Sequence, residues 1–286
     1  MNTQFWLIQA FNGISYGALL FLVGSGLSLI FGVMRIVNLS HGSYFLLGGY
    51  VALSVIWTTG SWLLAIPVAA LTIALVGVAM ERVFLRPLGF DPLRQVLLTV
   101  GFAFLFQQAA LDIWTGNNFD INPPDALTKS IVVGGLYLPL YRIFMIATAL
   151  IIGVVLWLAM EKTRMGAAVR ATVDDAQMAR GVGIDTSRIS MLIFALGAFL
   201  AALGGVIGGA FLGIYPGLDF EMLPIAFAVV IIGGMGSLGG AAIGALVVGL
   251  ADNFGKALFP EISYFTLYTP MALILAVKPT GLFGRE

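Results

Sequence analysis

The chain has 286 residues, of which 60% are hydrophobic and only 10% are charged, and its formal net charge is zero. Soluble domains carry about 25% charged residues, so a surface with this little charge suits lipid rather than water. The balanced charge gives no sign of a nucleic-acid partner. The absence of cysteine excludes disulfides, thiolate metal sites and cysteine nucleophiles.

The fold class follows from long apolar stretches, since one membrane span needs about 20 apolar residues. The 36 glycines fit a membrane bundle, where small residues let helices approach closely. We therefore predict an all-α, polytopic transmembrane bundle that forms a single domain over residues 1–286. Its expected segments, in chain order, are 5–33, 44–57, 62–80, 95–114, 143–160, 189–212, 223–250 and 264–277.

The first stretch is expected to stay as a helix, because it has neither the basic start nor the cleavage site of a signal peptide. The stretch 223–250 is interrupted by a glycine-rich run at 233–240. Such a break is tolerated at membrane depth only where protein packs around it or where it lines a cavity. We prefer a turn between two short helices, which gives eight to nine membrane segments in all.

Basic residues favour cytoplasmic loops. Loops 81–94 and 161–188 carry three and five such residues, whereas loop 115–141 carries only Lys129. This distribution places the first two loops inside and the N-terminus outside. It also places outside the short loop 213–222, which carries Asp219 and Glu221. With a turn at 233–240 the C-terminal tail, which carries Lys278 and Arg285, lies inside. A single uninterrupted span would place that tail outside, against the charge rule.

Loop 161–188 contains a helical pattern with a face of small apolar residues between Gly166 and Ala179. Such a face lies either on the bilayer surface or its own bundle, or in a groove of a partner protein. Surface helices usually carry large apolar anchors and a strongly basic polar face, whereas small side chains with mixed charge suit a groove. The candidate docking residues are Arg164, Gly166, Ala168, Arg170, Asp174, Asp175, Ala176, Ala179 and Gly183.

The break at 38–42 contains His41, the only histidine of the chain. A single histidine argues against a dedicated metal site. It could relay protons or simply satisfy backbone groups freed by the interrupted helix. Polar groups in spans usually face the bundle interior or a water-filled path. The candidate path residues are Asn38, Ser40, His41, Gln107, Gln108, Gly233, Gly234, Gly236 and Ser237.

No catalytic set can be assembled, so the chain is not expected to be an enzyme. Gly255-Lys256-Ala257 is the nearest approach to a phosphate-binding loop, but it lacks the hydroxyl residue and the upstream glycine. The chain is therefore expected to bind no nucleotide and no cofactor of its own.

Four segments, in this order, give the chain a family resemblance over essentially its whole length. They are Gly32–Gly42, Glu81–Leu88, Thr163–Ile184 and Val230–Ser237. The chain resembles the LivH-type permease of bacterial branched-chain amino acid ABC transporters, in the hydrophobic amino acid uptake family. Leu39-Ser40 stands where this family usually has Phe-Ala, and Ala167 where a basic residue is common.

The resemblance implies an internally repeated permease fold in the bacterial inner membrane, surrounded by lipid. In such a fold the breaks at 35–43 and 233–240 would correspond to each other, one in each half. It implies a second permease, usually a different chain. It also implies two cytoplasmic ATPases that bind ATP and Mg and that dock on the candidate docking residues of 161–188, which would make these the coupling residues. A periplasmic binding protein would deliver the solute, which is a branched-chain amino acid, urea, an amide or an aromatic acid. The rival interpretation is an ion-coupled secondary transporter, which would need a carboxylate at the membrane midplane.

Overall fold

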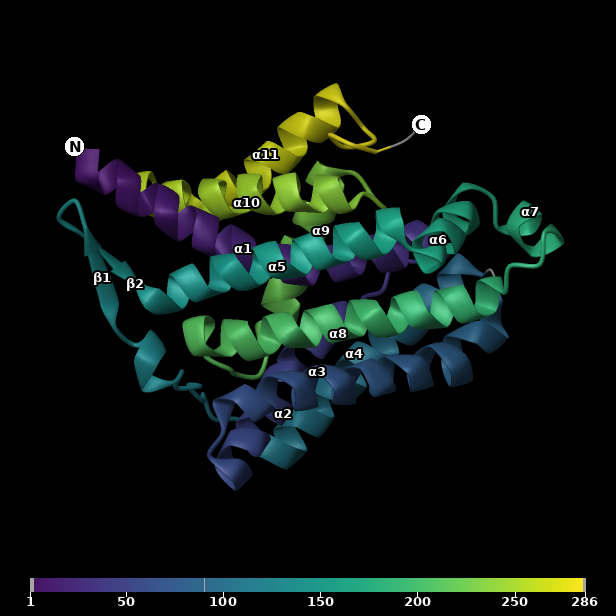
Figure 1. Cartoon of the computed structure of the whole chain (residues 1–286), viewed down its shortest axis with the longest axis horizontal. Helices are drawn as coiled ribbons and strands as arrows, with labels where there is room; N and C mark the ends of the chain where they lie inside the picture. Colours follow the sequence, from purple (N-terminus) through teal and green to yellow (C-terminus); the bar gives the residue numbers. More distant parts are fainter. Residues whose placement is uncertain (1–2, 90, 285–286) are drawn as a thin grey trace.

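A computed structural model describes residues 3–89 and 91–284 and is shown in Figure 1. Its α-helices are α1 (Thr3–Met34), α2 (His41–Thr59), α3 (Trp62–Ala79), α4 (Pro92–Trp114), α5 (Leu140–Lys162), α6 (Arg164–Asp174), α7 (Ala176–Gly181), α8 (Thr186–Leu212), α9 (Leu218–Gly233), α10 (Leu238–Leu258) and α11 (Ser263–Val277). A π-helix (Met80–Leu85) and a 3-10 turn (Arg86–Leu88) prolong α3, and further 3-10 turns lie at Asp125–Leu127 and Pro260–Ile262. Strands β1 (Ser130–Val133) and β2 (Leu136–Pro139) form an antiparallel hairpin with Ser130 opposite Pro139.

The predicted helical membrane bundle is confirmed. Six helices of the described part are long and apolar enough to cross a membrane. The other apolar helices, α2, α9 and α11, have 19, 16 and 15 residues. Together they account for the expected eight to nine segments. The glycine-rich run 233–240 is indeed a turn between two helices, because α9 ends at Gly233 and α10 begins at Leu238.

Two expected loop regions contain helix instead, and the one helix expected within 161–188 is divided in two. Much of 81–94 continues α3 as π- and 3-10 helix, and 161–188 holds two separate short helices. The expected outer loop 213–222 is shorter than predicted, since α9 begins at Leu218 and takes in Asp219 and Glu221. Acidic residues in a first helical turn are stabilised by the positive end of the helix, so the two carboxylates were signs of a helix start.

The chain repeats one plan twice, which confirms the internal repeat. The succession α1, α2, α3, α4 matches α8, α9, α10, α11. The long first helix of each half ends in a residue of positive φ, Arg35 (54°) or Gly213 (78°). Each second helix is followed by a glycine of positive φ and a serine that caps the third helix, namely Gly60-Ser61 and Gly236-Ser237.

The two halves run in opposite directions. Leu19 of α1 lies by Gly208 of α8, and Gly26 lies by Gly197, so the two long helices pack antiparallel. Helix α1 packs extensively on α10 of the second half, and α8 packs on α3 of the first. The repeat also corrects one expectation. The break at 35–40 corresponds to 213–217, and not to 233–240, whose counterpart is 60–61.

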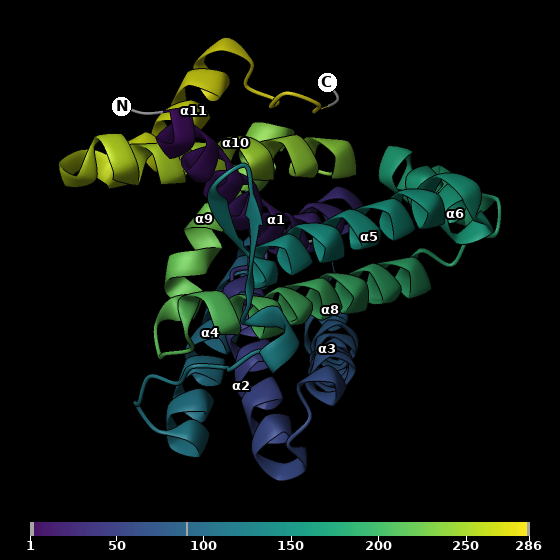
Figure 2. The ribbon, with the colours of Figure 1, turned by 60° about the vertical axis from the view of Figure 1, so that its left-hand side comes forward.

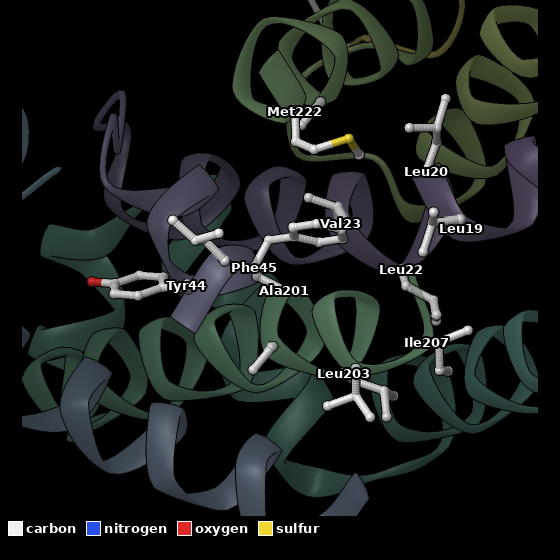
Figure 3. Close-up of a cluster of buried hydrophobic side chains, with 14 of the residues drawn as sticks. Leu19, Leu20, Leu22, Val23, Tyr44, Phe45, Ala201, Leu203, Ile207 and Met222 are labelled. Atoms are coloured by element: carbon white, nitrogen blue, oxygen red, sulfur yellow. The ribbon is translucent and has the colours of Figure 1, made fainter. Parts of the chain in front are cut away.

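The main core forms where α1, α2, α8 and α9 meet. Figure 3 shows side chains from these helices facing one another, among them Phe45 and Val23. Glycines allow this approach, because a Cβ on Gly204 would lie 2.9 Å from Val23 and a Cβ on Gly208 would lie 2.7 Å from the Phe45 ring. Helices α2 and α9 run across the directions of α5 and α8, as Figure 2 shows.

The loops gather at two opposite ends of the bundle. The hairpin β1–β2 lies at one end with the N-terminus, and α6 and α7 lie at the other (Figure 1). Arg86 donates a hydrogen bond of 3.1 Å to the Ser187 carbonyl, so the basic loops 81–94 and 161–188 share one end. Lys278 closes α11 at the C-terminus, whereas Arg285, used in the topology prediction, lies outside the described residues.

Candidate translocation site and coupling surface

The segment between α1 and α2 turns back into the bundle. Helix α1 ends with the Arg35 amide bonded to the Phe31 carbonyl at 2.8 Å, and Arg35 then reverses the chain with its positive φ. His41 Nε2 lies 3.0 Å from the carbonyl of Val23. Val23 stands 11 residues before the end of α1, which is about 16 Å of helix. The start of α2 therefore lies deep inside the bundle.

Three predicted path residues come together at this start of α2. Asn38, Ser40 and His41 are all fully buried. Asn38 Oδ1 accepts hydrogen bonds from the Ser40 amide at 3.2 Å and from the Ser40 hydroxyl at 2.7 Å. The amide side chain thus supports the turn into the helix, in the way short polar side chains support local backbone.

The polar cluster leaves some atoms without a partner among the described residues. These atoms include Asn38 Nδ2 and His41 Nδ1. Because Nε2 of His41 faces a carbonyl, which can only accept, Nε2 carries the proton and Nδ1 of the neutral ring is an acceptor. Buried polar groups are nearly always paired. These atoms are free to pair with water or with a ligand, as are Tyr50 Oη and Trp62 Nε1 elsewhere in the bundle.

Asp219 joins this cluster and was missed as a site residue. Placed by sequence in an outer loop, it is instead 2% exposed, in the first turn of α9. The Ser43 hydroxyl of α2 donates a hydrogen bond of 3.1 Å to its Oδ2 atom. The spacing of Asp219 and Glu221 could have signalled a helix start, but no local pattern indicates that α9 begins next to α2.

The two predicted glutamines lie on α4 and take no part in the hydrogen bonds of this cluster within the described part of the chain. Gln108 is exposed and donates a hydrogen bond of 2.9 Å to Asp112 in its own helix. Gln107 is half-buried on the same helix. The helix contacts the cluster through Thr99 instead, whose hydroxyl accepts a hydrogen bond of 3.2 Å from the Leu39 amide.

The predicted residues Gly233, Gly234, Gly236 and Ser237 form a tightly packed turn at another place. A Cβ on Gly233 would collide with the backbone of Gly240. Gly234 and Gly236 have φ angles of 97° and 83°, which other residues rarely adopt. Ser237 caps α10 by accepting a hydrogen bond of 3.0 Å from the Gly240 amide. This turn fixes α9 on α10.

An apolar cavity of about 290 Å³ lies between these two places. Its lining includes Phe31 of α1, Val37 of the re-entrant segment, Val230 of α9 and Met235 of the glycine turn. Val37 directly precedes Asn38, so the cavity adjoins the polar cluster. No three His, Asp or Glu side chains gather as a metal-binding group in the described residues.

The expected single coupling helix is two helices. Helix α6 ends at Asp174, and Asp175 caps α7 by accepting hydrogen bonds of 2.8 and 2.9 Å from the amides of Gln177 and Met178. The prediction of one helix from Gly166 to Ala179 was therefore wrong. Asp175 is better satisfied as a helix N-cap than inside a helix.

The small-residue face of this segment is covered by the chain itself, mainly at α6. Gly166, Val169 and Thr172 are buried, and a Cβ on Gly166 would collide with the carbonyl of Met160. Of the predicted coupling residues, Gly166 and Ala179 are buried and Ala168, Arg170 and Ala176 are half-buried. The remaining ones are exposed: Arg164, Asp174, Asp175 and Gly183.

Apolar residues on the opposite side of this segment are exposed. Met165 is 49% exposed, Met178 is 65% exposed and Val182 is 70% exposed. Arg170 holds the segment on α5 by donating to the Met160 carbonyl, and Arg35 donates a hydrogen bond of 3.4 Å to the Val173 carbonyl. We call the side chains of Met165, Met178 and Val182 the exposed coupling surface.

Comparison with known proteins gives one family. A model of the branched-chain amino acid transport system permease component matches residues 9–277. The chain is 32% identical, over all its length and 98% of the relative, to the high-affinity branched-chain amino acid transport system permease protein LivH of Escherichia coli K12. It is 28% identical to the corresponding permease protein BraD of Pseudomonas aeruginosa, covering 98% and 96% of the two chains.

More distant relatives follow. The chain is 26% identical to a probable branched-chain amino acid transport permease protein of Methanocaldococcus jannaschii, covering 96% and 91% of the two chains. The match over nearly the full chain agrees with the four motifs read in the sequence and with the repeated helical bundle. The chain belongs to the family of permease components of branched-chain amino acid transport systems.

Proposed function

We propose that this chain is one of two permeases in an ATP-driven importer that carries branched-chain amino acids inward across the bacterial inner membrane. Besides family membership, the observation that supports this proposal is the exposed coupling surface. Apolar side chains such as Met178 and Val182, at the end of the bundle beyond the membrane helices, favour a protein partner. That partner is a cytoplasmic ATPase, one for each permease, which binds ATP and Mg.

The contacts of α6 suggest how the movement reaches the solute path. Arg35 bonds to the Val173 carbonyl at the end of α6, and the same residue begins the re-entrant segment that leads to Asn38, Ser40 and His41. When the ATPases close on ATP they shift α6 and α7. Through Arg35 this shift pulls on the segment that holds the polar cluster.

The second permease lies beside α4, so that this side of the bundle faces protein rather than lipid. The exposed positions of α4 include Gln108 and Asp112, which are costly to expose to lipid. Apolar residues such as Leu97 and Phe104 are also exposed on α4. On α5, however, the exposed residues between Leu150 and Leu158 are all apolar, which suits lipid contact. The partner is a related permease, and a periplasmic binding protein delivers the solute to the end that carries the β-hairpin.

An ion-coupled transporter is the second candidate, because the structure holds a buried carboxylate, Asp219. A carboxylate inside a membrane bundle is a common device for binding a coupling ion. An ion-coupled transporter has no need of the exposed coupling surface at its cytoplasmic end. Family membership also weighs for the ATP-driven importer.

The test is co-purification of the ATPases with a Met178→Asp variant. A charge in the middle of an apolar contact should lower the recovered ATPase at least about tenfold, equivalent to about 1.4 kcal/mol or more. The matched control is Val133→Asp, an exposed apolar residue at the opposite end of the bundle. If Met178→Asp retains the ATPases and transports normally, the exposed coupling surface is not where they dock.

A further inference from the structure

The starts of α2 and α9 meet inside the bundle, one from each half of the repeat. The Ser43 hydroxyl donates to Asp219 Oδ2 at 3.1 Å, and the two residues are 1% and 2% exposed. Gly42 leaves no room for a side chain against the Asp219 carbonyl. Both helices therefore present their positive ends at one buried point.

Ser43 satisfies only one oxygen of this carboxylate. Asp219 Oδ1 is buried and has no hydrogen-bond partner within the described residues. His41 Nδ1 is a second free acceptor at the start of α2, and Asn38 Nδ2 is a free donor. A carboxylate and an amide that are buried without full pairing are costly, so a ligand that pairs with them would be bound favourably.

A structural role in starting α9 accounts for Asp219 only in part, although backbone amides of its own first turn also bond to the carboxylate. Glu221 lies in the same first turn but is exposed, and its Oε2 accepts a hydrogen bond of 2.8 Å from the Tyr215 hydroxyl. An exposed acidic residue already serves the positive end of the helix at lower cost. The burial of Asp219 therefore calls for a second role.

The surroundings suit a small zwitterion. The free carboxylate oxygen accepts from a cation, whereas the free Asn38 amide and the positive ends of α2 and α9 favour an anion. An amino acid combines these two charges. The apolar cavity of about 290 Å³ is not part of this contact, because its lining on α9 begins at Phe227, about 12 Å of helix beyond Asp219.

We propose that Asp219 binds the α-ammonium group of the transported solute, with Ser43 orienting the carboxylate. This contact selects amino acids over neutral amides and anionic aromatic acids, and it rests on the proposed function of the chain as an importer permease. In the described conformation the carboxylate is buried, so the solute reaches it when the starts of α2 and α9 separate during transport.

The test uses the assembled transporter of both permeases and ATPases. It is purified without the binding protein, so that the selectivity of the binding protein does not contribute to the measured binding. Binding of labelled leucine is compared with binding of 4-methyl-2-oxopentanoate, which has the same skeleton without the ammonium group. The wild type should prefer leucine by roughly 10- to 100-fold, as expected for a hydrogen-bonded charge. Asp219→Asn should lose most of this preference.

Glu221→Gln is the matched control and should keep the wild-type preference, because Glu221 is exposed and outside the cluster. A full preference for leucine in Asp219→Asn would overturn the proposal. If that variant does not assemble, Ser43→Ala carries the test, and its preference should fall several-fold. An unchanged preference in Ser43→Ala would then overturn the proposal.

The cation could instead be a coupling ion. Leucine binding is therefore repeated with sodium replaced by choline, and at pH 6 and 8. An ion or proton dependence that disappears in Asp219→Asn, with the leucine preference retained, would assign Asp219 to an ion and overturn the proposal. ATP-dependent leucine uptake by wild-type proteoliposomes tests the proposed importer function separately from the role of Asp219. Without that uptake the importer function itself fails, and with it this inference. Normal uptake with an intact preference in Asp219→Asn refutes only the role of Asp219.

Discussion

Gly32 of α1 and Gly236 of the turn after α9 touch backbone to backbone. A Cβ on Gly236 would lie 3.0 Å from the Cα of Gly32, and a Cβ on Gly32 would lie 2.9 Å from the Cα of Gly236. The contact joins the end of the first long helix to the turn that fixes α9 on α10. Both members of the pair therefore need glycine.

We predict that Gly233→Val, Gly234→Val and Gly236→Val impair transport more than membrane insertion. Valine at 233 collides with Gly240, and at 234 and 236 it also requires a positive φ. Each change should lower stability by about 1–3 kcal/mol or more, whereas the added hydrophobicity leaves insertion intact. Uptake and thermal stability are measured together. Gly239→Val is the control, because a Cβ there meets open space. Normal uptake in all three variants would contradict the packed turn.

Tryptophan substitutions should separate packing from docking in the coupling segment. Ala168 packs against the bundle through the cluster around Val169, so Ala168→Trp should displace α6 and lower stability by about 1–3 kcal/mol. Ala176 is half-buried at the start of α7, so Ala176→Trp should mainly weaken ATPase binding. Melting temperature and ATPase pull-down distinguish the two effects. Equal stability of both variants would refute the packing of α6 described above.

Removing charge from the same segment should have smaller effects. Arg170 and Glu161 form an exposed ion pair with 3.8 Å between Nη1 and Oε2, and exposed pairs contribute about 0–1 kcal/mol. Glu161→Gln is therefore expected to leave ATPase recovery within about twofold of the wild type, as measured in the same pull-down. A loss as large as that of Met178→Asp would mean that charge, and not apolar contact, carries the docking.

We predict that the N-terminus is outside and the C-terminus inside. Single cysteines can be labelled cleanly, because the native chain has none. A cysteine at Lys129, in the loop before the hairpin, should react with an impermeant reagent in intact cells. A cysteine at Met178, at the opposite end, should react only after the inner membrane is opened. Labelling of position 129 from the cytoplasmic side alone would reverse the assignment.

The purified chain alone is expected to hydrolyse no ATP. Lys256, from the nearest approach to a phosphate-binding loop, lies within α10 and pairs with the buried Asp252 at 2.8 Å. Lys256→Met should therefore lower stability by about 1 kcal/mol and leave phosphate release at background. Hydrolysis by the isolated chain that this substitution abolishes would count decisively against the expectation.

The sequence predicts the membrane helices well because their signal is local. An apolar run of about 20 residues has few alternatives to a helix in a bilayer, and the predicted run 95–114 lies inside α4, Pro92–Trp114. The prediction of a turn at 233–240, rather than a single uninterrupted span, is also confirmed. The family resemblance rests on motifs, and these are confirmed by matches over the full chain.

The sequence does not predict which residues meet across the repeat. Asp219 looks like a loop residue by its polarity, because charge in a short stretch between apolar runs usually indicates solvent. Only the antiparallel packing of α1 on α8 brings the start of α9 to Ser43 of α2. Likewise the pattern of small residues in α6 indicates a covered face, but it does not distinguish coverage by a partner from coverage by the chain itself.

The sequence by itself thus determined the membrane class, most helix positions and the family, because hydropathy and short motifs act within one segment. The tertiary structure alone decided that segment 35–40 corresponds to segment 213–217 in the repeat. It also decided that Asp219 is buried beside Ser43 and that Met178 rather than Ala168 faces outward. These relationships depend on contacts between residues far apart in the chain. Packing of the two inverted halves sets them, and no local pattern encodes that packing.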